Sequence, residues 1–194
     1  DAIAELLLAS NNLSGVVPQL AVVTGACVGT SSLIAATSDL VIMVKDGSYY
    51  LSKDDEGGQA DVMAEDTADA IAKAKALLSY LPSNNLAGLP VYESGAVSMG
   101  PCVSAGDCPA AVADPGTLFV LAEGSDCVTA FGQVDGMVCG LVTLTGDAVC
   151  SCTASRVARF VRLCDAFSLP VLTFVDAARF KGIRGAAKLS QAYT

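Results

Sequence analysis

Histidine is absent from all 194 residues of the sequence. Catalysis by a Ser–His–Asp or Cys–His arrangement requires an imidazole, so both are excluded. Most catalytic zinc sites also use histidine ligands and are excluded with them. Any chemistry must therefore come from backbone dipoles, carboxylates, lysines or a bound cofactor.

Positive charge is scarce. The chain has 11 Lys and Arg residues against 20 Asp and Glu, which gives a net charge of −9 and a pI of about 4.3. No cluster of Lys and Arg is present to neutralise phosphates, so nucleic acid is not an expected partner. An anionic ligand needs backbone N–H groups or a few well-placed cations.

Long hydrophobic runs are also missing, although the chain is 53% hydrophobic with a mean hydropathy of +0.54. The longest apolar run, 20–28, is far below the roughly 18 residues that a membrane-spanning helix needs. We therefore expect the excess apolar surface to be buried by other subunits, which predicts an oligomer.

The start of the chain shows no secretory or targeting segment. Several of the eight cysteines lie in apolar stretches, where free Cys behaves as a small hydrophobe. We therefore expect a cytoplasmic, reduced protein. Cys102 and Cys108 could form a disulfide with each other under oxidising conditions. Cys150 and Cys152, one residue apart and without further ligands, only weakly suggest a metal site.

Strand-like and helix-like segments alternate along the chain. The uninterrupted apolar run 40–44 is typical of a strand covered on both faces. Asp66 and Thr67 are good N-cap residues, and Asp135-Gly136 between two apolar runs predicts a hairpin. The expected helices are 2–11, 31–36, 66–80, 153–167 and 183–193, and the expected strands are 20–23, 40–44, 48–51, 117–121, 127–134, 137–144 and 171–175. The recurring strand–helix–strand order predicts an α/β fold.

Between residues 86 and 116 this pattern gives way to Gly, Pro, Ser and Ala. Such a composition is typical of a connecting segment. We therefore expect two domains, 1–94 and 117–194, joined by a linker over 95–116.

Several motifs in order resemble the biotin-dependent acyl-CoA carboxyltransferase and decarboxylase family, which includes subunits of propionyl-CoA carboxylase, methylmalonyl-CoA decarboxylase and glutaconyl-CoA decarboxylase. The motifs of the first half are GVVPQ at 15–19, GACVG at 25–29, TSDLVIM at 37–43 and LLSYLPSNN at 77–85. Those of the second half are VTAFG at 128–132, VDG at 134–136, RFVRLCDAF at 159–167, LTFVD at 172–176 and IRGAAKL at 183–189.

This resemblance implies a crotonase-like α/β fold of two related halves, each built from β-β-α units. Residues 1–94 are similar to the C-terminal part of the acyl-CoA-binding half, and 117–194 to the N-terminal part of the biotin-side half. The sequence thus begins and ends inside the family pattern. The implied substrate is a coenzyme A thioester, and the implied cofactor is biotin on a partner, the biotin carboxyl carrier protein. The implied assembly is a homo- or hetero-oligomer in which halves of different subunits face each other.

The resemblance also implies a site. Moving a carboxyl group to or from the carbon beside a thioester creates an enolate, which preorganised backbone N–H groups stabilise. At the matching turn we expect the N–H groups of Gly29 and Thr30 to form the oxyanion hole. The neighbouring substrate-binding residues are expected to be Gly25, Ala26, Cys27 and Val28. Gly25 and Gly29 would serve equally in a turn needed only for tight packing.

Two other functions stay open. A non-catalytic structural paralogue that assembles with an active subunit is favoured by Thr30 where the family has a second glycine, and by the short loops at 53–60 and 177–182. A crotonase-type hydratase or hydrolase fits the second-half motifs less well.

Several further residues are better explained by surface or packing roles than by catalysis or ligand binding. These are Asp165, Asp176, Arg184, Lys188, Tyr49 and Tyr50.

Overall fold

The computed structural model describes residues 2–52, 60–94, 102, 104–124, 126–146 and 149–178. The chain forms two compact units, Asp1–Ala87 and Gly88–Thr194. The division falls ahead of residue 94, where the sequence predicts the end of the first half. Each unit has its own sheet and helices, as the α/β prediction requires.

The first unit alternates short strands with helices. Its elements are α1 (Ala2–Leu13), β1 (Leu20–Val23), β2 (Ala26–Val28), α2 (Thr30–Ala36), β3 (Leu40–Val44), β4 (Ser48–Tyr50), β5 (Val62–Ala64) and α3 (Thr67–Tyr80). Strands β1, β3 and β5 form one parallel sheet, and β2 pairs in parallel with β4 in a second, two-stranded sheet. The order strand, strand, helix (β1, β2, α2) is therefore followed by three strands and a helix (β3, β4, β5, α3).

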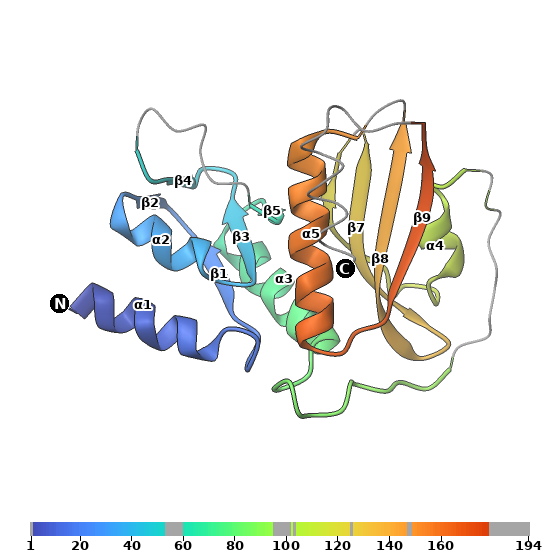
Figure 1. Ribbon diagram of the computed structural model, residues 1–194, viewed down its shortest axis with the longest axis horizontal. Helices are drawn as coiled ribbons and strands as arrows, with labels where there is room; N and C mark the ends of the chain where they lie inside the picture. Colours follow the sequence, from blue (N-terminus) through green and yellow to red (C-terminus); the bar gives the residue numbers. More distant parts are fainter. Residues whose placement is uncertain are drawn as a thin grey trace. The chain divides into compact units, whose positions relative to one another are not determined.

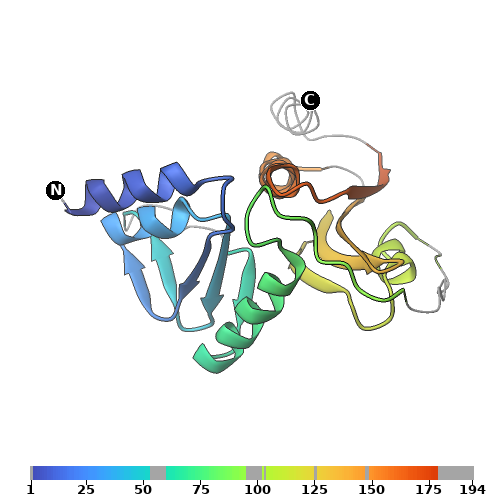
Figure 2. The ribbon, with the colours of Figure 1, turned by 90° about the horizontal axis from the view of Figure 1, so that it is seen from below.

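Helices cover the larger sheet of this unit on opposite sides, with α2 on one side and α3 on the other (Figure 2). Val41 and Ile42, successive residues of β3, point to opposite faces and are both fully buried. This explains the uninterrupted apolar run at 40–44. The N-cap prediction for α3 is confirmed, because the carboxylate of Asp66 accepts a hydrogen bond from Asp69 N at 2.9 Å.

The described part of the second unit is a four-stranded sheet with two helices (Figure 1). Its elements are α4 (Cys108–Val112), β6 (Phe119–Glu123), β7 (Cys127–Val134), β8 (Met137–Gly146), α5 (Ser151–Ala166) and β9 (Val171–Ala177). Strands β6, β7 and β8 are antiparallel neighbours, and α5 carries the chain across to β9, which lies parallel to β8. The expected helix at 183–193 lies outside the described residues.

The hairpin between β7 and β8 turns at the two residues that the sequence predicts. Asp135 and Gly136 have φ values of 53° and 77°. Two successive positive φ values match the right-handed twist of the flanking strands, and they favour Asp-Gly at these positions. The hairpin prediction is confirmed.

Both faces of β8 are covered, because successive residues contact different helices. A Cβ added at Gly140 would lie 2.6 Å from Cys164 Sγ, which shows how closely α5 approaches the strand. The next residue, Leu141, packs with Ala113 on the other face. Phe131 of β7 also contacts α5, with its ring centroid 5.2 Å from that of Phe160.

The described part of the expected linker is tied to this second unit. Residues 108–112 form α4, and the carboxylate of Asp114 accepts hydrogen bonds from Asp135 N at 3.1 Å and Gly136 N at 2.8 Å. Just ahead of the linker, Tyr92 N donates to Gly136 O at 3.1 Å. A Gly- and Pro-rich composition therefore marks a packed connection here.

The cysteines differ from the sequence expectation at one place. Cys150 and Cys152 are joined by a disulfide, whereas a fully reduced chain is expected. Cys102 and Cys108, which could bridge only under oxidation, are both free thiols. No helix in the described ranges combines the length and the apolar character that crossing a membrane requires.

Candidate functional site

The candidate site is built on the turn from β1 through β2 into α2. Gly29 is the N-cap residue of α2, with φ 65° and ψ −138°. This conformation is almost closed to residues with a side chain, so glycine is required there by the backbone itself. The short strand β2 just ahead of it is absent from the sequence prediction, which expects residues 25–30 to turn directly into the helix.

Hydrogen bonds hold this turn in place. Gly29 N donates to Tyr50 O of β4 at 3.1 Å, and Gly29 O accepts from both Ser32 N at 3.0 Å and Ser32 Oγ at 2.7 Å. Ser31 Oγ donates to Val28 O at 2.8 Å. The prediction that Gly29 N–H is a free oxyanion donor therefore conflicts with the structure, since a carbonyl of the neighbouring strand already accepts that hydrogen.

Two other backbone donors lie at the start of α2. Within the described ranges, neither Thr30 N–H nor Ser31 N–H has a hydrogen-bond acceptor. The first N–H groups of any helix lack partners inside the helix, so these two are available to an anionic atom. Of the predicted pair, only Thr30 remains a free donor, and Ser31 is a second that the sequence prediction omitted.

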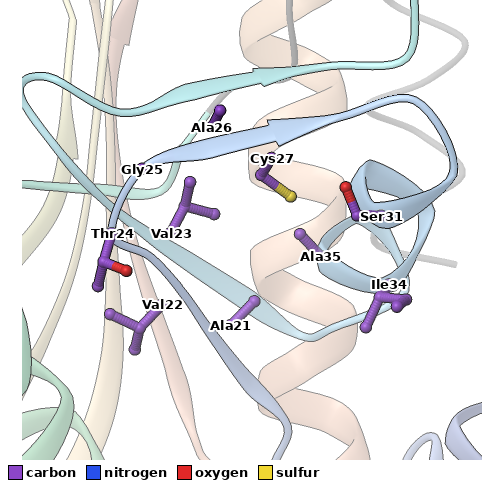
Figure 3. A pocket seen from close by; sticks show the side chains of 10 residues that line it. All are labelled: Ala21, Val22, Val23, Thr24, Gly25, Ala26, Cys27, Ser31, Ile34 and Ala35. Carbon is purple, nitrogen blue, oxygen red and sulfur yellow. The ribbon is translucent and has the colours of Figure 1, made fainter.

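A cavity of about 450 Å³ lies against this turn, between β1, β2 and α2 (Figure 3). Its ten lining residues are Ala21, Val22, Val23, Thr24, Gly25, Ala26, Cys27, Ser31, Ile34 and Ala35. Figure 3 shows the Cys27 thiol extending from β2 toward the side of the cavity where Ser31 and Ala35 lie. Space beside Gly25 is open, because an added Cβ would meet no atom within 4 Å.

The cavity wall has small side chains and almost no ionisable groups. Among the described residues that line it there is no Asp, Glu, Lys or Arg, and Cys27 is the single titratable side chain. Polar atoms come from Thr24, Cys27, Ser31 and the backbone. Such a wall accommodates an apolar or neutral group and offers dipoles in place of an acid or base.

The structure brings half of the predicted site residues to this cavity. Gly25, Ala26 and Cys27 line it, whereas Val28, Gly29 and Thr30 do not. The prediction missed the β1 residues of the wall and the face of α2 made by Ser31, Ile34 and Ala35. Their spacing of three and four residues on a helix was a usable signal.

The residues given surface or packing roles agree with that interpretation where they are described. Asp165 is exposed on α5, and Asp176 is exposed on β9, where it borders a separate cavity of about 480 Å³. Tyr49 is buried in the first core beside Val23 and Val41. Arg184 and Lys188 lie outside the described residues.

No group of three or more Cys, Asp or Glu side chains suited to a metal ion occurs among the described residues. Cys150 and Cys152 form a disulfide with each other. Burial, the largest cause in each case, raises the pKa of Cys127 to about 11 and that of Cys164 to about 12. These two thiols stay protonated and inert near neutral pH.

A comparison with known protein families identifies the chain. The carboxyl transferase domain family matches residues 2–52 and 54–188, which is nearly the whole sequence. The chain belongs to the carboxyl transferase family. The resemblance drawn from the separate sequence motifs is thereby confirmed, and so is the crotonase-like α/β fold.

Two curated members of the carboxyl transferase family show how much of a full-length relative the chain represents. The propionyl-CoA carboxylase beta chain of Saccharopolyspora erythraea is 29% identical, and the alignment covers 98% of this chain and 46% of the relative. The methylmalonyl-CoA decarboxylase subunit alpha of Veillonella parvula is 28% identical, with 100% and 49% covered. The chain spans about half the length of these relatives.

A solved structure of a similar protein has the same fold as this chain. The transcarboxylase 12S crystal structure, described as a hexamer with hydrolysed methylmalonyl-coenzyme A bound, superposes with a TM-score of 0.86 at 27% identity. The superposition covers 98% of this chain and 47% of the 12S chain. The units of this carboxyl transferase chain therefore have the folds of the matching parts of the 12S chain.

Proposed function

We propose that the chain is part of a biotin-dependent carboxyltransferase subunit and holds an acyl-CoA thioester in the cavity beside Gly25. The thioester oxygen faces the N–H groups of Thr30 and Ser31. The enolate formed during carboxylation or decarboxylation places its negative charge on that oxygen. The supporting observations are that Thr30 N–H and Ser31 N–H have no acceptor among the described residues, and that Ser31 lines a cavity whose described wall residues include no carboxylate.

The physical reason is electrostatic. An enolate oxygen is stabilised most by donors that are already oriented before the reaction, and backbone N–H groups need no reorganisation. A carboxylate in the wall would repel that oxygen, and none is among the described residues that line the cavity. The bond from Gly29 N to Tyr50 O fixes the residue ahead of the donors, so their direction is set by the sheet.

Biotin on a carrier protein supplies or accepts the carboxyl group in this proposal. Within the described second unit, no glycine leads directly from a strand into a helix as Gly29 does. We therefore assign no described residue to biotin. In this proposal the described residues of the chain supply only the acyl-CoA side of the site. The assembly with other subunits is also proposed, because the chain spans only about half the length of its relatives.

The test is a matched pair of variants at Thr30 titrated with short acyl-CoA thioesters by calorimetry. Thr30→Pro removes the N–H, and proline is well tolerated at the first position of a helix. Thr30→Ala keeps the N–H and removes only the side chain. We expect Thr30→Pro to raise Kd about fivefold, since one hydrogen bond contributes about 1 kcal/mol, and Thr30→Ala to change it little.

Rate measurements with a biotin partner separate ground-state binding from enolate stabilisation. Loss of one oxyanion donor lowers kcat by roughly 10² to 10³ in other enzymes, and we expect Thr30→Pro to fall in that range. Equal binding and equal rates for the two variants would contradict the proposal.

The second candidate function, a structural subunit without catalytic activity, is favoured by a specific observation. Gly29 N–H is engaged by Tyr50 O, which leaves one donor of the predicted pair. Folded wild-type protein that assembles but binds no acyl-CoA would support this role and exclude the first.

A further inference from the structure

A disulfide joins Cys150 to Cys152 at the N-terminal end of α5. Cys150 is the N-cap residue of this 16-residue helix, and Cys152 is its second residue. Only one residue separates the two cysteines. The bond belongs to the second unit.

This disulfide adds little to the stability of the fold. In the chain-entropy description, the stabilisation by a disulfide grows with the length of the loop that it closes, and this loop is among the shortest available. The start of α5 is held by other bonds in any case. Thr153 Oγ1 donates to both oxygens of the Asp126 carboxylate at 2.8 Å, and Cys150 N donates to the same carboxylate at 3.2 Å.

The two cysteines differ in exposure. Cys152 is exposed, whereas Cys150 is partly buried. An incoming thiolate therefore reaches the Cys152 sulfur more readily. Attack on one sulfur of a disulfide expels the other as a thiolate, so Cys150 is the leaving group.

The surroundings of Cys150 suit a leaving thiolate. Its Sγ accepts a hydrogen bond from Thr153 N at 3.3 Å, and the N-terminal end of a helix stabilises negative charge. The Asp126 carboxylate opposes this effect, but it is shared with Thr153 Oγ1 and Cys150 N. The balance favours expulsion of Cys150 over expulsion of the exposed Cys152.

We propose that Cys150 and Cys152 form a reversible thiol–disulfide exchange site for small thiols. A thiolate RS⁻ attacks Cys152 Sγ, the protein S–S bond breaks, and Cys150 leaves as a thiolate that takes a proton from solvent. A second RS⁻ attacks the mixed disulfide at the sulfur of R, which releases RSSR and the Cys152 thiolate. Two thiols are oxidised and one protein disulfide is reduced, and oxidised RSSR reverses both steps.

The other cysteine pair of this unit provides an internal contrast. Cys102 Sγ and Cys108 Sγ each donate to Ser104 O at 3.4 Å and are not bonded to each other. The hydrogen bond with Cys102 raises the pKa of the Cys108 thiol to about 11, so it is rarely a nucleophile at neutral pH. Of these two pairs, only the one at the start of α5 is bonded.

The test uses the full chain purified without reductant. Samples are equilibrated with reduced and oxidised glutathione at a series of ratios, quenched in acid, alkylated and mapped by peptide mass spectrometry. We expect alkylation of Cys150 and Cys152 to rise together with reduced glutathione and to fall again with oxidised glutathione. Circular dichroism is expected to stay unchanged throughout. Cys108→Ser is the control and is expected to leave this behaviour intact.

Single variants test the order of attack. Serine is a strong N-cap residue, so Cys150→Ser retains the start of α5. With oxidised glutathione, Cys152 in Cys150→Ser is expected to form the mixed disulfide several-fold faster than Cys150 in Cys152→Ser. Equal rates or the reverse order would overturn the assignment of Cys150 as leaving group. A pair that stays bonded in excess dithiothreitol while the protein is folded, or that never bonds with oxidised glutathione, would overturn the site itself.

Discussion

Gly29 N donates a hydrogen bond to Tyr50 O at 3.1 Å, and this bond joins the strand-to-helix turn of the candidate site to strand β4. The bond extends the pairing of β2 with β4 by one residue, up to the N-cap of α2. The Gly29 N–H group is therefore not free to bind a ligand. Gly29 belongs to the sheet, and the donors available to a ligand start at Thr30.

The conformation of Gly29 predicts a specific sensitivity to substitution. Gly29→Ala is expected to lower the free energy of unfolding by about 1–3 kcal/mol, because an L-residue at φ 65° is strained. Gly25→Ala is the matched control, since an added Cβ at either glycine meets no atom within 4 Å and φ is positive only at Gly29. Urea unfolding of both variants measures the difference. Equal stability of the two would contradict the role given to the backbone here.

A second pair of glycines separates backbone strain from steric overlap. Gly136 and Gly116 both have φ of 77°, but a Cβ at Gly136 would overlap Tyr92 O, whereas one at Gly116 meets nothing within 4 Å. We expect Gly136→Ala to cost about 1–3 kcal/mol more than Gly116→Ala. Thermal unfolding of the two variants tests this. A smaller loss for Gly136→Ala would show that residues 91–94 do not pack on the hairpin.

Because the Cys164 thiol is buried, we predict that the protein loses stability at alkaline pH. Burial raises the pKa of Cys164 from 9.0 to about 12. Above pH 9 the unfolded chain releases this proton while the folded chain keeps it, so the free energy of unfolding falls as the pH rises from 9 toward 12. Cys164→Ala is expected to flatten this slope in urea unfolding measured at about pH 8 and about pH 11. An unchanged slope would show that Cys164 ionises freely in the folded protein.

Much of the fold follows from local sequence signals. The run 40–44 is apolar at every position, since β3 is covered on both faces, and Asp135-Gly136 satisfies two positive φ values directly. Asp66 caps α3 as its side-chain chemistry predicts. In each case the decisive interaction lies within a few residues.

The features that the sequence did not predict depend on distant residues. Strand β2 is three residues long and exists because it pairs with β4, about twenty residues later. Strand β5, also three residues long, is defined by its pairing with β3. The disulfide was equally hidden, because two cysteines one residue apart are compatible with free thiols, a metal site or a bond.

The candidate site lies at the turn that the sequence motifs indicate, but the free backbone donors there differ from the predicted pair. Family motifs located residues 25–30, and Gly25, Ala26 and Cys27 do line the cavity. Which N–H groups are free depends on Tyr50, whose carbonyl reaches Gly29 across the sheet. The residues around Gly29 in the sequence give no indication of this hydrogen bond to Tyr50.

The most direct test of the proposed acyl-CoA site is an amide NMR titration of the ¹⁵N-labelled chain with a non-reactive acyl-CoA analogue. We predict that the amide proton signals of Thr30 and Ser31 shift downfield as they gain an acceptor, while that of Gly29, already bonded to Tyr50 O, changes little. Unchanged Thr30 and Ser31 signals at saturation, or a shift confined to residues away from the cavity, would contradict the account.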